Sequence, residues 1–142
     1  MRLEITADLL EQIHRHGESA YPSEGAGFML GNSSPDWRVV TAILELPNAR
    51  EQSAQHNRYL LTPQDMLRSE QEAARLGLDV IGVFHSHPDH PNQPSEFDRQ
   101  WAMPWFSYII TSVNDGSAVA SRSWRLTDDR EQFVEESIQV IR

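Results

Sequence analysis

The chain has 142 residues, a formal net charge of −9 and no cysteine, and this length predicts one domain over residues 1–142 with its own hydrophobic core. The acidic balance argues against nucleic acid as a partner, and without thiolates any metal must be held by histidine, aspartate or glutamate. No apolar run is long enough to cross a membrane, and residues 1–18 lack the apolar core of a secretion signal, so we expect a cytoplasmic protein without membrane contact.

The first third of the chain predicts a helix followed by a strand. Apolar residues recur at helical spacing from Ile5 to Ile13, and Thr6 or Asp8 is available as the N-cap. The short apolar run AGFMLG at 26–31 is framed by glycines and predicts a strand. We therefore expect a leading helix followed by a strand.

The middle of the chain predicts a second strand and a long helix. RVVTAILEL at 38–46 is rich in β-branched residues and predicts a strand, whereas 47–58 has the composition of a polar loop. The helix that follows has clear signals at both ends: Thr62 can cap it, Pro63 takes its first position and Gly77 ends it.

The last part of the chain alternates strands with one short helix. LDVIGVFHS at 78–86 predicts a buried strand, PSEFDRQWAM at 94–103 a short helix and WFSYIITSV at 105–113 another strand. After an Asn-Asp-Gly turn, 117–126 predicts a further strand, while 131–141 fits a strand or a helix. Strands interleaved with a few helices predict an α/β or α+β domain with a mostly buried sheet.

A candidate metal site lies where the buried strand ends. His85 and His87 are two residues apart, so on a strand both imidazoles point to the same face. Pro88 then turns the chain, and Asp98 occupies the third position of a short helix that Ser95 can cap. Two histidines and one carboxylate leave a fourth position open, as in catalytic zinc sites. The alternative is an ordinary capping box formed by Ser95 and Asp98, which needs no metal.

A second metal motif overlaps these residues. HSHPDH also fits the dinuclear signature of metallo-β-lactamases, but that fold needs histidine ligands downstream and a longer chain, and no histidine follows His90. Asp89 and His90 are therefore expected to be loop residues that could line the cleft. The remaining histidines are expected to be solvated or structural: His14, His16 and His56.

Two separated segments together resemble a known family. HSHPDHPNQPSEFD at 85–98 matches the signature H-S/T-H, seven residues, S-x-x-D of the JAMM (MPN-plus) metallopeptidases without a gap. YPSEGAGFMLG at 21–31 resembles the segment that carries an upstream glutamate in bacterial members, which puts Glu24 in that position. The chain is most similar in outline to the compact bacterial peptidases that act on sulfur-carrier proteins.

The resemblance implies a fold and a mechanism. The fold would be a curved mixed β-sheet flanked by helices, with cytidine-deaminase-like layering. One zinc ion would be held by His85, His87 and Asp98. Glu24 would activate the zinc-bound water and pass its proton to the leaving amine, and Ser95 would stabilise the oxyanion. Ser86, between the two histidines, would face the opposite side and have no catalytic role.

The resemblance also implies a substrate class. The expected reaction is hydrolysis of a peptide or isopeptide bond after the C-terminal Gly-Gly of a ubiquitin-like, sulfur-carrier type protein, whose tail would be the partner. Two alternatives stay open: a non-catalytic MPN-type interaction scaffold, and a zinc hydrolase of small amides or amino-acid conjugates. The oligomeric state does not follow from the sequence. The tryptophans are expected to lie mostly in the core: Trp37, Trp101, Trp105 and Trp124.

Overall fold

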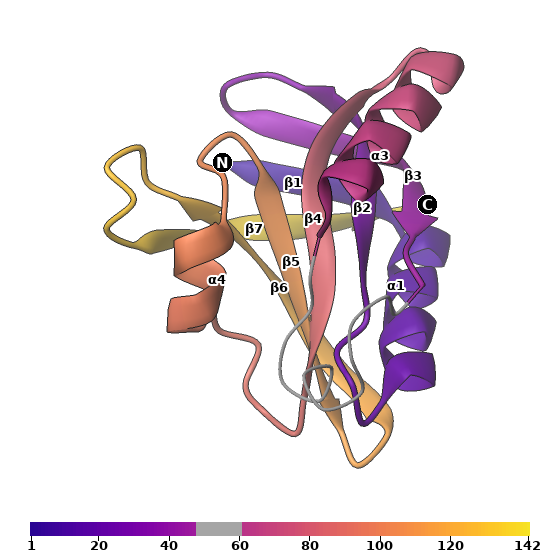
Figure 1. Ribbon diagram of the computed structural model, residues 1–142, viewed down its shortest axis with the longest axis vertical. Coiled ribbons are helices and arrows are strands. Elements are labelled where there is room, and N and C mark those ends of the chain that lie inside the picture. Colours follow the sequence, from indigo (N-terminus) through magenta and orange to yellow (C-terminus); the bar gives the residue numbers. More distant parts are fainter. Residues whose placement is uncertain (48–60) are drawn as a thin grey trace.

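The computed structural model describes residues 1–47 and 61–142. In chain order its elements are β1 (Arg2–Thr6), α1 (Ala7–Ala20), β2 (Ala26–Ser33), β3 (Trp37–Glu45), α3 (Pro63–Leu76), β4 (Asp79–Pro88), α4 (Glu96–Trp101), β5 (Ser107–Asn114), β6 (Ser117–Leu126) and β7 (Phe133–Ile141) (Figure 1). The polar loop expected at 47–58 falls outside these residues apart from Pro47, and so does His56. No helix in the described ranges is long and apolar enough to cross a membrane.

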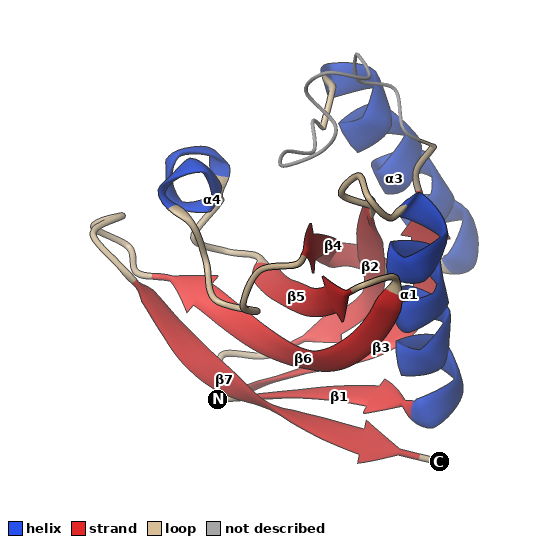
Figure 2. Cartoon of the chain, turned by 90° about the horizontal axis from the view of Figure 1, so that it is seen from below, coloured by secondary structure: helices blue, strands red, loops and turns tan. Residues whose placement is uncertain are grey.

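The seven strands form one strongly curved mixed sheet. Their spatial order is β1-β3-β2-β4-β5-β6-β7, and β7 returns to pair with β1, so the sheet closes into a barrel. Three pairs are parallel, β1 with β3, β1 with β7 and β4 with β5, and the others are antiparallel. Figure 2 shows the curvature of the sheet, with α1 and α3 on one side of the view and α4 set apart from them. The expected curved mixed sheet flanked by helices is confirmed.

The N-terminus departs from the expectation. Ile5 belongs to strand β1, and the helix begins only at Ala7, with Thr6 as its N-cap accepting a hydrogen bond from the backbone N–H of Leu9 over 3.2 Å. The expected cap at Thr6 is confirmed, but Ile5, which the helical spacing had included, lies before the helix because β1 pairs with β7 at the far end of the chain, where Ile5 lies opposite Val140. Such long-range pairing leaves no local signal in the sequence.

The helix α3 follows its end signals closely. Thr62 accepts a hydrogen bond from the N–H of Asp65 over 3.1 Å, and the carboxylate of Asp65 accepts one from the N–H of Thr62 over 3.0 Å. Pro63 occupies the first turn, and Gly77 ends the helix with φ of 71°, a left-handed conformation that glycine adopts without strain. The predicted capping pattern is therefore confirmed.

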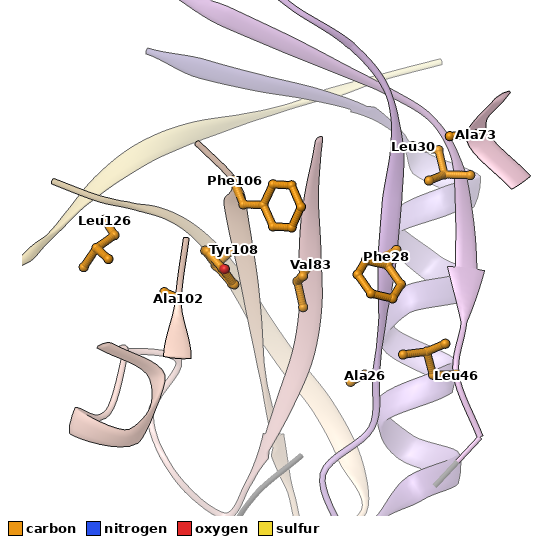
Figure 3. Close-up of a cluster of buried hydrophobic side chains, with 10 residues drawn as sticks. All are labelled: Ala26, Phe28, Leu30, Leu46, Ala73, Val83, Ala102, Phe106, Tyr108 and Leu126. Carbon is orange, nitrogen blue, oxygen red and sulfur yellow. The ribbon is translucent and has the colours of Figure 1, made fainter. Parts of the chain in front are cut away.

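Hydrophobic side chains fill both faces of the sheet. Phe28 and Met29 are neighbours on β2 and enter different clusters, as the alternation along a strand requires. One cluster packs beneath α3 and the end of α4 and is shown in Figure 3: Ala26, Phe28, Leu30, Leu46, Ala73, Val83, Ala102, Phe106, Tyr108 and Leu126. The other packs against α1: Leu3, Ile5, Ile13, Met29, Val40, Ile81, Phe84 and Ile109.

The tryptophans contradict the expectation of a core position. Trp101 and Trp105 are 66% and 64% exposed, and Trp37 and Trp124 are only half-buried. Trp101 ends α4 and Trp105 precedes β5, and both edge an apolar surface beside α3. The segment 131–141, which fitted a strand or a helix, forms strand β7.

Candidate functional site

The two motif histidines lie on the central strand β4, between β2 and β5. His85 and His87 point to the side that carries Val83 and the helix α4, and both are buried. Ser86 points the other way, toward α1, where a Cβ added to Gly17 would lie only 3.1 Å from the Ser86 Cβ. Because β4 is hydrogen-bonded on both edges, the two imidazoles are held on a rigid element.

Asp98 reaches the same point from α4. Its Oδ1 lies 3.2 Å from His85 Nε2, and its Oδ2 lies 3.2 Å from His87 Nε2. The two Nε2 atoms are also 3.2 Å apart. The carboxylate is oriented by the start of the helix, because Oδ2 accepts a hydrogen bond from the N–H of Ser95 over 2.8 Å, while the N–H of Asp98 donates to Ser95 Oγ over 3.1 Å. The capping box and the convergence on the histidines therefore exist together.

The donor set fits a zinc ion. The Nδ1 of His87 lies 2.8 Å from the carbonyl oxygen of Pro91, which can only accept, so Nδ1 carries a proton, and in the neutral ring this leaves Nε2 able to bind a metal ion. Four ligands at about 2.0–2.1 Å around tetrahedral zinc lie about 3.3 Å from one another, close to the 3.2 Å separations of His85, His87 and Asp98. These three residues form the group in the described ranges that could hold a metal.

The electrostatics of the cluster are those of one carboxylate between two buried imidazoles. Burial alone would raise the pKa of Asp98, but the charge of His85 and the hydrogen bonds from both histidines and Ser95 hold that pKa well below its usual range. Burial lowers the pKa of His85. Burial also opposes charge on His87, but the hydrogen bond and charge of Asp98 outweigh it and raise the pKa of His87. Asp98 is therefore ionised, as a ligand must be.

Glu24 lies just before β2, at the position that continues the β2–β4 register to His87. Ala26 pairs with His85 in the antiparallel register of β2 and β4, and continuing this register by two residues places Glu24 opposite His87. Beyond the paired residues, the Ser86 N–H donates to the Gly25 carbonyl over 3.0 Å, and the Gly25 N–H donates to Ser86 Oγ over 2.8 Å. Glu24 is 6% exposed and lines the same cavity as His87.

A cavity of about 360 Å³ brings the sequence-predicted residues together. Its lining is Glu24, His87, His90, Pro91, Gln93, Pro94 and Ser95. Glu24 and Ser95, predicted to act in catalysis, thus share one cleft with the ligand His87, and His90 lines it as the sequence suggested. Their catalytic and ligand roles stay predictions, since the arrangement allows but does not test them.

Three contacts near the cleft were missed by sequence reasoning. Asp89, expected to be a loop residue, accepts hydrogen bonds from the Tyr21 hydroxyl over 2.6 Å and from the Asp115 N–H over 2.8 Å. The Trp124 indole donates to the carbonyl of Asn92 over 3.1 Å, which ties the loop before α4 to β6. These partners lie 26 to 68 residues apart in the sequence, and no spacing rule connects them.

The other described histidines have structural contacts. His14 Nε2 lies 2.8 Å from Ser121 Oγ, and His16 Nε2 lies 3.1 Å from the carbonyl oxygen of Ala26. The ring of His16 also packs edge-on against Phe84. Neither belongs to the metal-type group, in agreement with the structural role expected from the sequence.

An apolar cavity of about 420 Å³ also borders α4. Helix α4 contributes Phe97, the neighbour of Asp98, and the exposed Trp101. The remaining lining comes from α3, its approach and the start of β5: Leu61, Thr62, Pro63, Met66, Met103, Phe106 and Tyr108. The same short helix thus contributes Asp98 to the metal-type cluster and two aromatic side chains to an apolar surface.

Comparison with known proteins places this site in a family. Residues 6–127 match the family described as prokaryotic homologs of the JAB domain. The chain is 28% identical over 137 residues to a desampylase of Haloferax volcanii, covering 94% of this chain and 95% of that protein. It is 30% identical over 114 residues to a probable TtuB-protein conjugate cleaving protease of Thermus thermophilus, covering 78% of this chain and 72% of that protein.

A solved structure agrees on the fold. The JAB1/MPN domain protein of Archaeoglobus fulgidus superposes with a TM-score of 0.59 at 20% identity, covering 98% of this chain and 99% of that one. At this identity the likeness concerns the fold alone. Together with the matched family and the protease relatives, it establishes that the chain belongs to the prokaryotic JAB-domain family and is an enzyme, a hydrolase of the protease type.

Proposed function

We propose that this enzyme is a zinc-dependent peptidase that hydrolyses the peptide or isopeptide bond after the C-terminal Gly-Gly of a ubiquitin-like protein. The observation that carries the proposal is the convergence of His85, His87 and Asp98, with ligand atoms 3.2 Å apart, beside a cleft that Glu24 and Ser95 line. The names of two relatives, a desampylase and a probable TtuB-protein conjugate cleaving protease, support a conjugate as the substrate.

In the proposed mechanism His85, His87 and Asp98 hold the zinc ion. When bound, zinc would lower the pKa of a water molecule in the cleft toward neutrality and supply a nucleophile near pH 7. Glu24 accepts the proton of the attacking water as the new carbon–oxygen bond forms at the scissile carbonyl. It then gives this proton to the leaving nitrogen as the carbon–nitrogen bond breaks, so that the carboxyl returns to its starting state.

The Ser95 hydroxyl can act as a hydrogen-bond donor during the reaction. Its Oγ accepts from the Asp98 N–H, so the hydroxyl proton remains available to donate to the developing oxyanion. The capping contact fixes Oγ at the rim of the cleft, and the serine therefore needs no rearrangement during the reaction. His87 is kept in its ligand orientation by the carbonyl of Pro91.

The apolar cavity beside α4 offers a place for the body or tail of the protein substrate. Phe97 and Trp101 flank it on the helix that also carries Asp98. A chain whose glycines reach the cleft must pass α4, and apolar residues upstream of those glycines would be buried there rather than left in water.

The decisive experiment compares cleavage of a ubiquitin-like protein joined through its Gly-Gly to a lysine with cleavage of short Gly-Gly peptides. Wild type should cleave the conjugate, and Glu24→Gln should retain zinc and lose activity by at least about a thousandfold. Glu11→Gln, on the exposed face of α1, is the matched control and should behave as wild type. The chain contains no lysine of its own, so every isopeptide bond in the assay belongs to the substrate.

The two other candidate functions predict different results. A non-catalytic scaffold would bind the conjugate without cleaving it, and Glu24→Gln would then change nothing. A hydrolase of small amides would cleave short peptides or amino-acid conjugates as fast as the protein conjugate. Preference for the protein conjugate, lost with the Glu24 carboxylate, supports the proposal over both.

A further inference from the structure

Two loops that carry functional residues are joined by one hydrogen bond. The Tyr21 hydroxyl donates to Asp89 Oδ2 over 2.6 Å. Tyr21 follows α1 and lies three residues before Glu24, while Asp89 lies two residues after His87. The bond therefore connects the segment that carries the proposed base to the end of the strand that carries the proposed ligands. Neither residue belongs to the lining of the cleft.

Asp89 is itself firmly anchored. Its N–H donates to the carbonyl of Val113 at the end of β5 over 2.8 Å, and its Oδ1 accepts from the N–H of Asp115 in the β5–β6 turn over 2.8 Å. Its φ of 59° is left-handed, a conformation that aspartate and asparagine tolerate better than most residues. The carboxylate therefore presents Oδ2 to Tyr21 from a fixed position.

Glu24 is thus held from both sides of its segment. On the C-terminal side, Gly25 exchanges two hydrogen bonds with Ser86, which lies between the ligands. On the N-terminal side, the corresponding link to the ligand strand is the bond from Tyr21 to Asp89. Within the segment itself, the Ser23 N–H donates back to the carbonyl of Ala20 over 2.8 Å, at the end of α1.

We propose that Tyr21 and Asp89 are positioning residues that fix the carboxylate of Glu24 relative to the metal ligands. The inference rests on the proposed role of Glu24 as the base, and it adds how this base is aligned. A general base acts only within hydrogen-bond reach of the proton that it removes, and misplacement by about 1 Å can cost about a hundredfold in rate. Loosening the attachment through Tyr21 should therefore lower turnover without touching the zinc ligands.

A merely structural role would have a different signature. If the bond only stabilised the fold, its removal would lower the melting temperature and leave kcat of the folded enzyme unchanged. If Tyr21 contacted the substrate, its removal would raise KM. A positioning role lowers kcat and leaves KM and zinc content as they are.

Tyr21→Phe isolates the bond, because the ring that packs beside the turn at Gly116 stays in place. Thr127→Val is the matched control: it removes another hydroxyl that donates over 2.6 Å to an aspartate, Asp129 in the β6–β7 connection. Asp89→Asn is the second variant, since asparagine tolerates the left-handed backbone and keeps one acceptor oxygen. Each protein is compared after zinc loading has been measured.

The first readout does not depend on activity. Hydrogen exchange of the Ser23 and Gly25 amides, followed by NMR in zinc-free and zinc-loaded protein, should be at least about threefold faster in Tyr21→Phe, and that of Val83 in β4 unchanged. Unchanged exchange at Ser23 and Gly25 would overturn the positioning role. This hydrogen-exchange measurement tests the positioning role even if wild type cleaves no conjugate. Absence of cleavage would count against the proposed function instead.

The second readout is turnover. Tyr21→Phe should lower kcat about five- to tenfold, with KM within about twofold of wild type and zinc retained, and Asp89→Asn should act in the same direction. Thr127→Val should change neither kcat nor the exchange at Ser23 and Gly25. A kcat of Tyr21→Phe equal to that of wild type, or a rise in KM at constant kcat, would contradict the proposal.

Discussion

Ser95 and Asp98 hold each other at the start of α4 through two reciprocal hydrogen bonds, from the Asp98 N–H to Ser95 Oγ over 3.1 Å and from the Ser95 N–H to Asp98 Oδ2 over 2.8 Å. The same Oδ2 lies 3.2 Å from His87 Nε2. This pair of hydrogen bonds therefore caps the helix, orients the proposed ligand Asp98 and fixes the proposed oxyanion donor Ser95. A mutation at Ser95 has two separable consequences.

Replacement of Ser95 separates helix capping from chemistry. Ser95→Ala should lower the free energy of unfolding by about 1 kcal/mol, because the N-cap acceptor is lost, whereas glycine at an N-cap costs only a few tenths. Both Ser95→Ala and Ser95→Gly should lower kcat by about a hundredfold, because both remove the hydroxyl donor. The measurement pairs denaturant unfolding with steady-state kinetics. If Ser95→Gly keeps wild-type kcat, Ser95 is a cap only.

The buried phenol of Tyr108 predicts a loss of stability in alkali. Burial raises the pKa of Tyr108 to about 12 from its usual 10.0. Because the folded value is the higher one, this contribution is fully present below pH 10 and is lost as the pH rises from about 10 to 12, by about 2–3 kcal/mol in total. Denaturant unfolding at several pH values measures it.

Tyr108→Phe is the control for this pH dependence. The hydroxyl accepts a hydrogen bond from the Met103 N–H over 2.7 Å, so its removal should cost about 1–3 kcal/mol at pH 9. The variant has no proton to lose, and its stability deficit should shrink toward pH 12. Parallel curves for the two proteins over this range would contradict the assignment.

The exposed Trp101 tests the apolar surface beside α4. Trp101→Ala should raise KM for a protein conjugate about tenfold, since an exposed aromatic at the edge of an apolar cavity is a typical binding anchor. KM for a short Gly-Gly peptide and kcat should stay within about twofold. Val119→Ala, which shortens a similarly exposed apolar side chain on β6, is the control. An equal effect on both substrates would remove this surface from substrate recognition.

A buried ion pair links β6 and β7. Glu136 on β7 is 1% exposed and accepts hydrogen bonds from Arg125 Nε over 2.6 Å and Ser123 Oγ over 2.8 Å. Glu136→Ala leaves Arg125 without this partner and should cost about 3–5 kcal/mol of unfolding free energy. The neighbouring Glu135→Ala removes an exposed pair with Arg122 and should cost less than about 1 kcal/mol. Similar losses in both variants would show that burial does not decide the cost.

The sequence predicted those parts of the fold and site that have local signals. His85 and His87 share a strand face and Asp98 sits at a fixed helical position, so their convergence follows from spacing, and α3 carries both of its end signals. The strand β1 was not predicted, because its partner β7 lies at the other end of the chain and leaves no local signal. The bond between Tyr21 and Asp89 spans 68 residues, and only the folded chain brings these side chains together.

The position of Glu24 likewise depends on long-range contacts rather than on a local sequence signal. Its residue type says nothing by itself, and only the resemblance singled it out from the other acidic residues. In the structure its position follows from the register of Ala26 with His85, continued by the bonds between Gly25 and Ser86. Register between strands is set by packing over the whole sheet, which a sequence motif does not encode.

The most direct test of the account is the zinc content of the purified protein, measured by mass spectrometry for wild type, Asp98→Ala and Asp65→Ala. Asp65 is the matched control because it completes the same capping box with Thr62 on α3, and no histidine pair lies beside it among the residues that the structure describes. About one zinc per chain in wild type and Asp65→Ala, with loss in Asp98→Ala, is the predicted result. Equal zinc in all three proteins, or none in wild type after zinc is added, would contradict a metal centre built from His85, His87 and Asp98.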